Sequence, residues 1–192
     1  MALELHCTEL QTKAETLYYL EDALGENVPI VSLTMAISTS ELARELLMPE
    51  RIVGVSLLPP FAESTFAEIM PSMFTDKATI RTAERFFESL GLRTERVGDS
   101  PGGVLVRTVC CLVNEAALAL QDKIATAEEI DQAMLLGVNY PSGPLAWGDK
   151  IGLDRVLAVM DGLYAEFKEE RYRTTPLLRK LVRAGRAAGS KN

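Results

Sequence analysis

The stretch from Asp99 to Asp154 decides the fold class, and its informative parts are DSPGGVLVRT (99–108), NEA (114–116), EEIDQAM (128–134) and NYPSGPLAWGDKIGLD (139–154). Apolar residues recur with helical spacing from Gly102 to Gln121 and from Leu153 to Phe167. Thr126 and Glu129 form a capping box, which predicts that a further helix starts between these two. The pattern therefore predicts an all-helical region that ends with a helix near Pro176–Ala188.

Upstream of this stretch, helical and strand-like patterns alternate. Strand-like runs are expected at Val28–Leu33, Arg51–Leu58, Phe66–Met70 and Leu92–Val97. Helices are expected at Leu10–Leu24, Ser38–Leu47 and Lys77–Leu90. Strands separated by helices predict a parallel sheet of βα units. The chain is thus expected to have two domains, an α/β region over residues 1–98 and a helical domain over residues 99–192.

Composition excludes several classes of function. The net charge of −7 argues against a nucleic-acid partner, because phosphate binding needs clustered Lys and Arg. The one basic run is expected to be a solvated helix end, and it consists of Arg179, Lys180, Arg183, Arg186 and Lys191. No signal sequence opens the chain, and no apolar run approaches the ~20 residues of a membrane span. A cytoplasmic protein without a membrane partner is therefore expected.

Cysteine and histidine are too scarce for a disulfide framework or a metal site. The three cysteines are Cys7, Cys110 and Cys111, and the adjacent pair lies in an apolar helical pattern, so both are expected to be reduced and buried. The only histidine, His6, stands beside Cys7 without another ligand at a familiar spacing. A mechanism that needs a histidine base therefore has one candidate.

The residues of the helical stretch resemble the 3-hydroxyacyl-CoA dehydrogenase family, including its 3-hydroxybutyryl-CoA enzymes. They are most similar to the C-terminal helical repeat of the two-repeat enzymes of phenylacetate breakdown. The matching residues are Asp99, Pro101, Gly102, Asn114, Glu115, Ala116, Ile130, Asp131, Ala133, Met134, Gly143, Pro144, Asp149, Gly152, Leu153 and Asp154. The resemblance implies a helical domain of the 6-phosphogluconate dehydrogenase C-terminal-like type.

The first hundred residues resemble, more weakly, the later part of the family's Rossmann domain. The matching parts are Lys13 and its helix, Ile30–Thr34, Pro49–Val55 and Phe66–Met70. The family's opening strand and its G-x-G-x-x-G loop, which holds the dinucleotide, have no counterpart in the sequence. The expected fold class is therefore a partial, truncated Rossmann-like α/β region followed by an all-α domain.

The departures from the family bear on activity. In the family, a histidine takes the proton of the 3-hydroxyl group, a glutamate holds that histidine, and NAD accepts the hydride. Ser56 stands at the position of the histidine, whereas Glu68 matches the glutamate. The family's Asn-Thr-Ser segment reads Leu33, Thr34 and Met35, so apolar residues replace two polar groups near the reacting oxygen and the cofactor. The family's asparagine at the start of the long helix is also replaced, by Val106 before Arg107. A serine without an activating partner cannot serve as a general base.

Three hypotheses follow. The first is a non-catalytic subunit in fatty acid or phenylacetate catabolism, which binds an acyl-CoA or serves in assembly, with Ser56, Glu68 and Arg107 as candidate substrate-binding residues and no cofactor. The second is one part of a split NAD-dependent dehydrogenase, in which another chain supplies the NAD loop. The third is an enzyme that uses Glu68 as an acid or base with a desolvation-raised pKa; against it, Glu68 could reach solvent or pair with Arg51 or Arg107.

A homodimer through the helical domain is the expected assembly. The helix at Gly102–Gln121 is apolar on more than one face, so it must be covered on more than one side. The resemblance also implies a full-length dehydrogenase as a candidate partner and an acyl-CoA as a candidate ligand.

Overall fold

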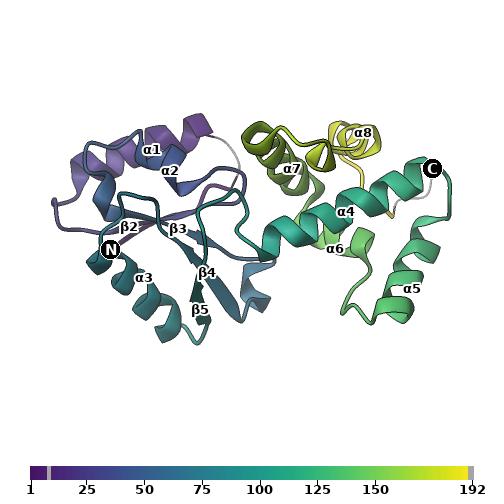
Figure 1. The fold of residues 1–192 in the computed structure, drawn as a ribbon, viewed down its shortest axis with the longest axis horizontal. Coiled ribbons are helices and arrows are strands. Elements are labelled where there is room, and N and C mark those ends of the chain that lie inside the picture. Colours follow the sequence, from purple (N-terminus) through teal and green to yellow (C-terminus); the bar gives the residue numbers. More distant parts are fainter. Residues whose placement is uncertain (8–9, 190–192) are drawn as a thin grey trace. The chain divides into compact units, whose positions relative to one another are not determined.

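The computed structural model describes residues 1–7 and 10–189 (Figure 1). The chain divides into two compact units, Met1–Val106 and Arg107–Asn192. The first unit is an α/β sheet structure and the second is helical, so the expected order of fold classes is confirmed. The division falls in the first turn of helix α4 (Leu105–Gln121).

The first unit contains a five-stranded sheet in the order β1-β2-β3-β4-β5. The strands are β1 (Ala2–Glu4), β2 (Ile30–Leu33), β3 (Ile52–Ser56), β4 (Phe66–Met70) and β5 (Arg93–Arg96). The first of these, β1, was not predicted from the sequence. It is short, and only one of its three residues is buried, so it carries almost no alternating pattern.

The prediction of a wholly parallel sheet is wrong at one position. Strands β1, β2 and β3 are parallel, as are β4 and β5, but β3 and β4 are antiparallel. Residues 57–65 join β3 to β4 and hold only the short 3-10 helix η2 (Phe61–Glu63). A parallel crossover needs about a dozen residues or more, so this short link returns the chain antiparallel.

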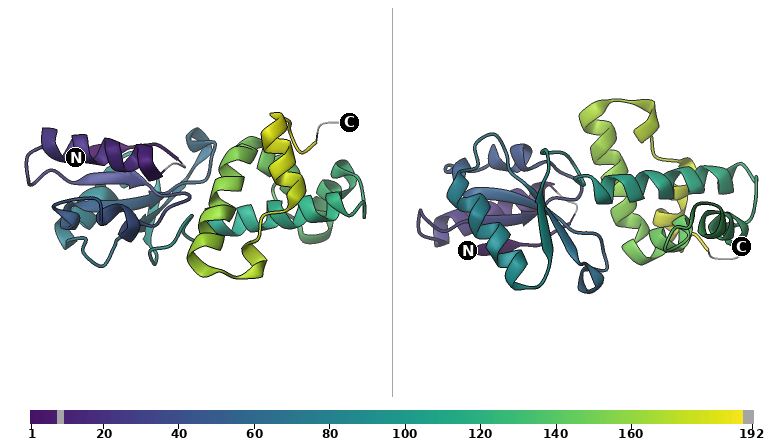
Figure 2. Two further views of the ribbon diagram at one scale, coloured as in Figure 1. Left: turned by 90° about the horizontal axis from the view of Figure 1, so that it is seen from above. Right: turned by 60° about the horizontal axis from the view of Figure 1, so that its bottom comes forward.

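Helices cover both faces of the sheet (Figures 1 and 2). Helices α1 (Leu10–Ala23) and α2 (Thr39–Ala43) lie on one face, and α3 (Lys77–Ser89) lies on the other. A further short 3-10 helix, η1 (Pro49–Arg51), leads into β3. The Ser38 hydroxyl accepts a hydrogen bond from the Glu41 N–H at 3.2 Å, which confirms the predicted helix start. That helix ends at Ala43 and not at Leu47, because the chain tightens into i→i−3 turns after it.

The second unit consists of helices, with α4 and α7 at its centre. The elements are α4, α5 (Ala127–Val138), α6 (Pro144–Ile151), α7 (Leu153–Phe167), η3 (Glu170–Tyr172) and α8 (Pro176–Ala184). The capping box of Thr126 and Glu129 is present as predicted. Helix α4 begins at Leu105 and not at Gly102, because Gly102 and Gly103 have φ angles of 73° and 57°.

Buried side chains from α4 and α7 form the core of this unit, among them Val109, Val113, Val156 and Met160. Cys110 is buried as expected, whereas Cys111 is half-buried, and the three cysteines are free thiols. Burial raises the pKa of both adjacent thiols, so neither is activated as a thiolate. Within residues 1–7 and 10–189, no helix is long and apolar enough to cross a membrane.

Candidate functional site

Ser56 and Glu68 are brought together by the antiparallel pairing of β3 with β4. Ser56 ends β3, and it lies directly opposite Glu68 in the register of the two strands. Both residues are buried, with 2% and 3% of their surface exposed. Residues opposite one another in a sheet have neighbouring Cβ atoms. The family resemblance predicted a related pair of side chains at these two positions, and the register agrees with it.

The Glu68 carboxylate binds the start of helix α4. It accepts hydrogen bonds from the backbone N–H of Val104 at 3.0 Å and from that of Leu105 at 3.1 and 3.2 Å. These N–H groups are among those that a helix start leaves without a partner inside the helix. Gly103 lies so close that a Cβ atom there would collide with Glu68 Oε2. Both carboxylate oxygens are therefore used in a structural contact.

Burial raises the pKa of Glu68 above its ordinary value, and the backbone hydrogen bonds from Val104 and Leu105 partly oppose this shift. The raised pKa expected from desolvation is thus confirmed. The expectation that Glu68 reaches solvent or pairs with Arg51 is wrong, because its partners are backbone N–H groups. The Arg51 guanidinium instead donates to the carbonyl oxygens of Gly25 and Glu21, at 2.9 and 3.0 Å.

Ser56 has a structural partner as well. Its hydroxyl donates to the carbonyl oxygen of Gly102 at 3.1 Å. No imidazole stands beside it, because the only histidine, His6, binds Glu4 through its backbone N–H at 2.6 Å and its Nδ1 at 3.1 Å. Among the described residues, therefore, no neutral imidazole lies beside the Ser56–Glu68 pair to act as a general base.

The apolar replacements lie in the core of the first unit. Leu33, Met35 and Val106 are at most 1% exposed, and Thr34 is fully buried against β3. The Thr34 hydroxyl donates to the Val55 carbonyl oxygen at 3.3 Å. Leu33, Met35 and Val106 fill the core, and the Thr34 hydroxyl is used in a hydrogen bond to the backbone. None of the four side chains therefore presents a free polar group.

Arg107 belongs to the second unit and is held there by two aromatic rings. Its guanidinium carbon lies 4.8 Å from the centre of the Phe167 ring and 5.1 Å from that of Tyr172, and an Nη2–H donates to the Tyr172 hydroxyl. Cation–π contacts of this kind favour a fixed side-chain position. These contacts with Phe167 and Tyr172 make Arg107 part of the packing of the helical unit.

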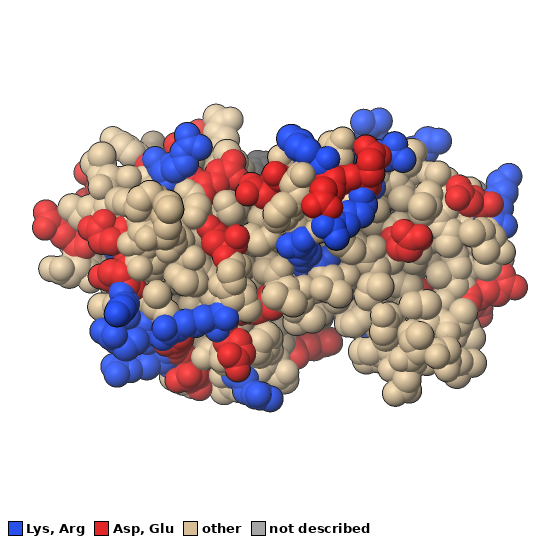
Figure 3. Space-filling model, viewed as in Figure 1, with Lys and Arg blue, Asp and Glu red and all other residues tan. Residues whose placement is uncertain are grey.

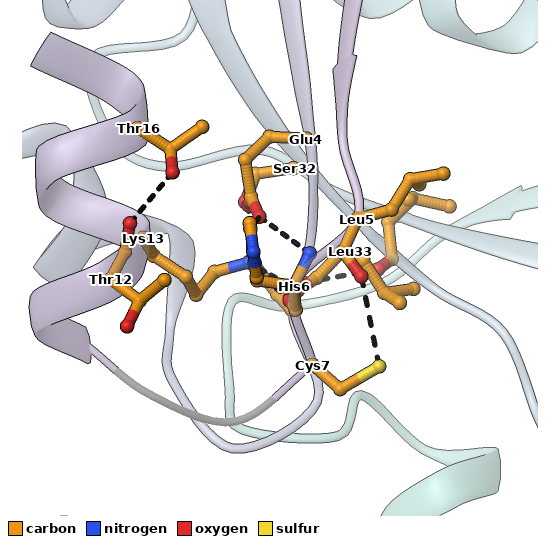
Figure 4. Close-up of polar contacts among 11 residues, drawn as sticks. Glu4, Leu5, His6, Cys7, Thr12, Lys13, Thr16, Ser32 and Leu33 are labelled. Atoms are coloured by element: carbon orange, nitrogen blue, oxygen red, sulfur yellow. Dashed lines mark hydrogen bonds and ion pairs between the residues drawn. The ribbon is translucent and has the colours of Figure 1, made fainter. Parts of the chain in front are cut away.

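A buried ionic cluster at the carboxyl ends of β1 and β2 was not predicted as a site (Figure 4). Lys13 is fully buried, and its ammonium group binds the Glu4 carboxylate, the His6 carbonyl oxygen at 2.8 Å and the Leu33 carbonyl oxygen at 2.8 Å. Ser32 donates its hydroxyl to Glu4 at 2.6 Å. Burial lowers the pKa of Lys13, and the nearby Glu4 charge opposes this shift. The sequence contained a signal for the burial of Lys13, because Lys13 and Leu17 are four positions apart and so lie on the same face of the predicted helix.

The starts of helices α2, α3 and α4 do not fit the diphosphate of NAD. A dinucleotide diphosphate binds free N–H groups at a helix N-terminus. At α2 those of Thr39 and Ser40 bind the Asp99 carboxylate at 2.6 and 2.7 Å. Asp76 caps α3 and Glu68 caps α4 in the same way. Carboxylates would repel phosphate at these three positions, and the sequence contains no G-x-G-x-x-G.

Comparison with known protein families gives the same result for both units. Residues 102–192 match the family described as 3-hydroxyacyl-CoA dehydrogenase, C-terminal domain, and residues 1–100 match 3-hydroxyacyl-CoA dehydrogenase, NAD binding domain. The sheet and the helical unit are thus similar to the two domains of one family.

Individual relatives agree with this assignment. The 3-hydroxybutyryl-CoA dehydrogenase of Clostridioides difficile is 35% identical over 184 residues, which are 96% of this chain and 66% of that protein. The 3-hydroxyadipyl-CoA dehydrogenase of Escherichia coli K12 is 45% identical over 104 residues, which are 54% of this chain and 22% of that protein. The crystal structure of (S)-3-hydroxybutyryl-CoA dehydrogenase from Ralstonia eutropha has a TM-score of 0.87 at 35% identity, and it covers 99% of this chain and 70% of that one. The chain spans about two thirds of the length of the curated relatives that it matches over most of its residues.

Proposed function

Because the chain belongs to the 3-hydroxyacyl-CoA dehydrogenase family, we propose that it is a non-catalytic member, which binds an acyl-CoA or serves as an assembly subunit. The observation that carries this proposal is the use of Ser56 and Glu68. At the position that the family resemblance assigns to the base, Ser56 donates to a backbone carbonyl, and Glu68 is occupied by the start of α4. General acid–base catalysis contributes about 10²–10⁴-fold to a rate, so its loss removes much of the activity.

The test is a dehydrogenase assay with the purified chain, NAD and 3-hydroxybutyryl-CoA. We expect no formation of NADH above the rate without protein. A full-length 3-hydroxybutyryl-CoA dehydrogenase serves as the positive control under the same conditions. Steady turnover by the chain alone would refute the proposal.

A histidine variant separates the loss of the base from the loss of the cofactor site. Ser56→His restores the residue type that the family uses, but the carboxylate caps at α2, α3 and α4 stay in place. We therefore expect Ser56→His to remain inactive. Turnover by this variant, with none by Ser56→Ala, would show that a dinucleotide binds in spite of the caps.

Ligand binding distinguishes the two forms of the proposal. Calorimetry with acetoacetyl-CoA, free CoA and NAD should give heat with acetoacetyl-CoA and none with NAD if the chain retains an acyl-CoA site. An assembly subunit binds none of the three. Saturable NAD binding contradicts both forms.

A cytoplasmic location and a 6-phosphogluconate dehydrogenase-like type for the helical unit are further parts of the proposal.

A second candidate is one part of a split NAD-dependent dehydrogenase, and the free edge of the sheet favours it. On β1 and just beyond it, Leu3 and Leu5 are 40% and 59% exposed, whereas the opposite edge strand β5 carries Arg93, Glu95 and Arg96. Natural sheets protect their edges with charges, and β1 lacks them on its exposed face. An added strand from a cofactor-binding chain would cover that edge. The chain should then co-purify with a full-length dehydrogenase, and adding the chain should change the activity of that enzyme. The absence of both a complex and a change in activity would exclude this candidate.

A further inference from the structure

Helix α1 (Leu10–Ala23) exposes two neighbouring aromatic side chains. Tyr18 is 63% exposed and Tyr19 is 70% exposed, and their rings meet edge to face with the ring centroids 5.8 Å apart. The packing side of the helix lies elsewhere, because Lys13 and Leu17 are fully buried. A tyrosine side chain can bury about 150–250 Å² in an interface or a core. The tyrosine pair therefore marks a face of α1 that the described residues leave uncovered.

The same face of α1 carries carboxylates and no cation. Glu15 and Asp22 are both exposed, and each of them is three or four positions from both tyrosines, so all four side chains share one side of the helix. Among the described residues, Asp22 has no side-chain partner. The one lysine of the helix, Lys13, is buried with Glu4. The two rings are thus flanked by negative charge.

The surroundings of α1 are acidic as well. Residues 1–51 contain nine Asp and Glu but three Lys and Arg, and two of these three, Lys13 and Arg51, are buried. Arg44 is the only exposed Lys or Arg in this range. In Figure 3, red groups surround the part that Figure 1 labels α1 and α2, and blue atoms form one small group there. The acidic surface is therefore wider than one helix.

An exposed apolar side chain is held beside this helix. The Glu21 carboxylate accepts hydrogen bonds from the N–H groups of Leu47 and Met48, both at 2.8 Å, so the segment after α2 is tied to α1. Leu47 is 88% exposed, and Glu45 just before it is exposed too. Apolar and aromatic groups with charged groups around them are typical of protein interfaces, in which tyrosine is enriched.

We propose that the α1 face, comprising Glu15, Tyr18, Tyr19 and Asp22, docks an arginine-rich segment of another protein. A guanidinium group fits both features of this face, because it stacks on aromatic rings and pairs with carboxylates. The second unit contains such stacking, since Arg107 lies 4.8 and 5.1 Å from two ring centres. A second copy of this chain does not fit through the same face, because two acidic surfaces repel each other. Nucleic acids and anionic lipids are disfavoured for the same reason.

The α1 face uses none of Ser56, Glu68 and Arg107, so the proposal goes beyond the proposed function and does not depend on acyl-CoA binding. Its test is a titration of a fluorescein-labelled hexa-arginine peptide with the whole chain, followed by fluorescence anisotropy. At about 50 mM salt, where exposed charges are weakly screened, we expect saturable binding that weakens as salt is added. A hexa-glutamate peptide should not bind.

Two double variants separate the rings from the charges. Tyr18→Ala/Tyr19→Ala should weaken the binding of hexa-arginine about five- to tenfold, as expected for two exposed cation–π contacts. Tyr18→Phe/Tyr19→Phe should bind like the wild type, because the rings remain. Glu15→Gln/Asp22→Asn should weaken binding and flatten its dependence on salt, because two of the attracting charges are gone.

Matched controls are needed because a chain with a net charge of −7 attracts any cationic peptide to some extent. Phe74→Ala removes an aromatic ring that is 48% exposed in the same unit. Glu63→Gln/Glu128→Gln removes two exposed carboxylates from other surfaces. Both controls should bind hexa-arginine like the wild type, and every variant should keep the wild-type circular dichroism spectrum.

Three results would overturn the proposal. The first is the absence of saturable hexa-arginine binding by the wild-type chain. The second is an equal loss of affinity in Glu15→Gln/Asp22→Asn and in the control that removes two carboxylates elsewhere, because the peptide would then respond only to net charge. The third is an unchanged affinity of Tyr18→Ala/Tyr19→Ala, since the rings would then take no part. Failure of acyl-CoA binding would leave this inference untouched.

Discussion

Lys13 is a buried cation whose position depends on a full set of partners. Its ammonium group has three hydrogen-bond acceptors, and Glu4 supplies the compensating charge. A buried ion pair adds little net stability, but the loss of one member leaves the other charge uncompensated. The pair is therefore better understood as a fixed junction between β1, α1 and β2 than as a stabilising contact.

Replacement of Lys13 by Met should lower the free energy of unfolding by about 3–5 kcal/mol, because Glu4 is left buried without its cation. Chemical denaturation measures this change. The double variant Lys13→Met/Glu4→Gln should cost less than the sum of the two single variants. Lys150→Met, at an exposed position, should shift stability by no more than about 0.5 kcal/mol. Additive effects in the double variant would show that the two charges do not interact.

Glu68 should make stability depend on pH. Its folded-state pKa is raised above the ordinary value of 4.5, so the folded protein binds an extra proton between the two values. The contribution to stability is fully present below the unfolded pKa and is lost as pH rises through the folded pKa. Glu68→Gln cannot ionise and should remove this decline, measured by denaturation from about pH 4 to about pH 8. The exposed Glu63→Gln should retain the wild-type profile; equal profiles for both variants would count against a titrating Glu68.

At the scale of elements, the junction between β4 and α4 depends on the two glycines before the helix. Gly103 has a positive φ and lies against the Glu68 carboxylate, so the cap and the backbone conformation require each other. The structure thereby explains why the helix starts at Leu105, although the apolar pattern extends to Gly102.

Gly103→Ala should destabilise the first unit by about 1–3 kcal/mol, since alanine disfavours this φ and its Cβ would displace Glu68. Thermal and urea denaturation both report the change. Gly98→Ala is the control, because a Cβ there meets no described atom within 4 Å, and it should be neutral within about 0.5 kcal/mol. Equal stability of the two variants would mean that Glu68 does not constrain this turn.

At the scale of the whole molecule, the division into two units has a measurable consequence. Each unit has its own buried core, and the only tryptophan, Trp147, lies in α6 of the second unit. Tryptophan fluorescence therefore reports on the second unit, whereas far-UV circular dichroism reports on both.

We expect the two signals to give different denaturation midpoints, because unfolding of a two-unit chain departs from a two-state transition. Lys13→Met should lower the circular dichroism midpoint while the fluorescence midpoint stays in place. Coincident transitions in the wild type, shifted together by Lys13→Met, would show one cooperative molecule instead.

The sequence alone determined the order of the units, most helix positions and the capping box at Thr126, because these depend on local periodicity and short motifs. It also identified the family. Only the tertiary structure decided the antiparallel β3–β4 pairing, the burial of Lys13 and the capping of α4 by Glu68. Each of these joins residues far apart in the chain, where local pattern carries no signal.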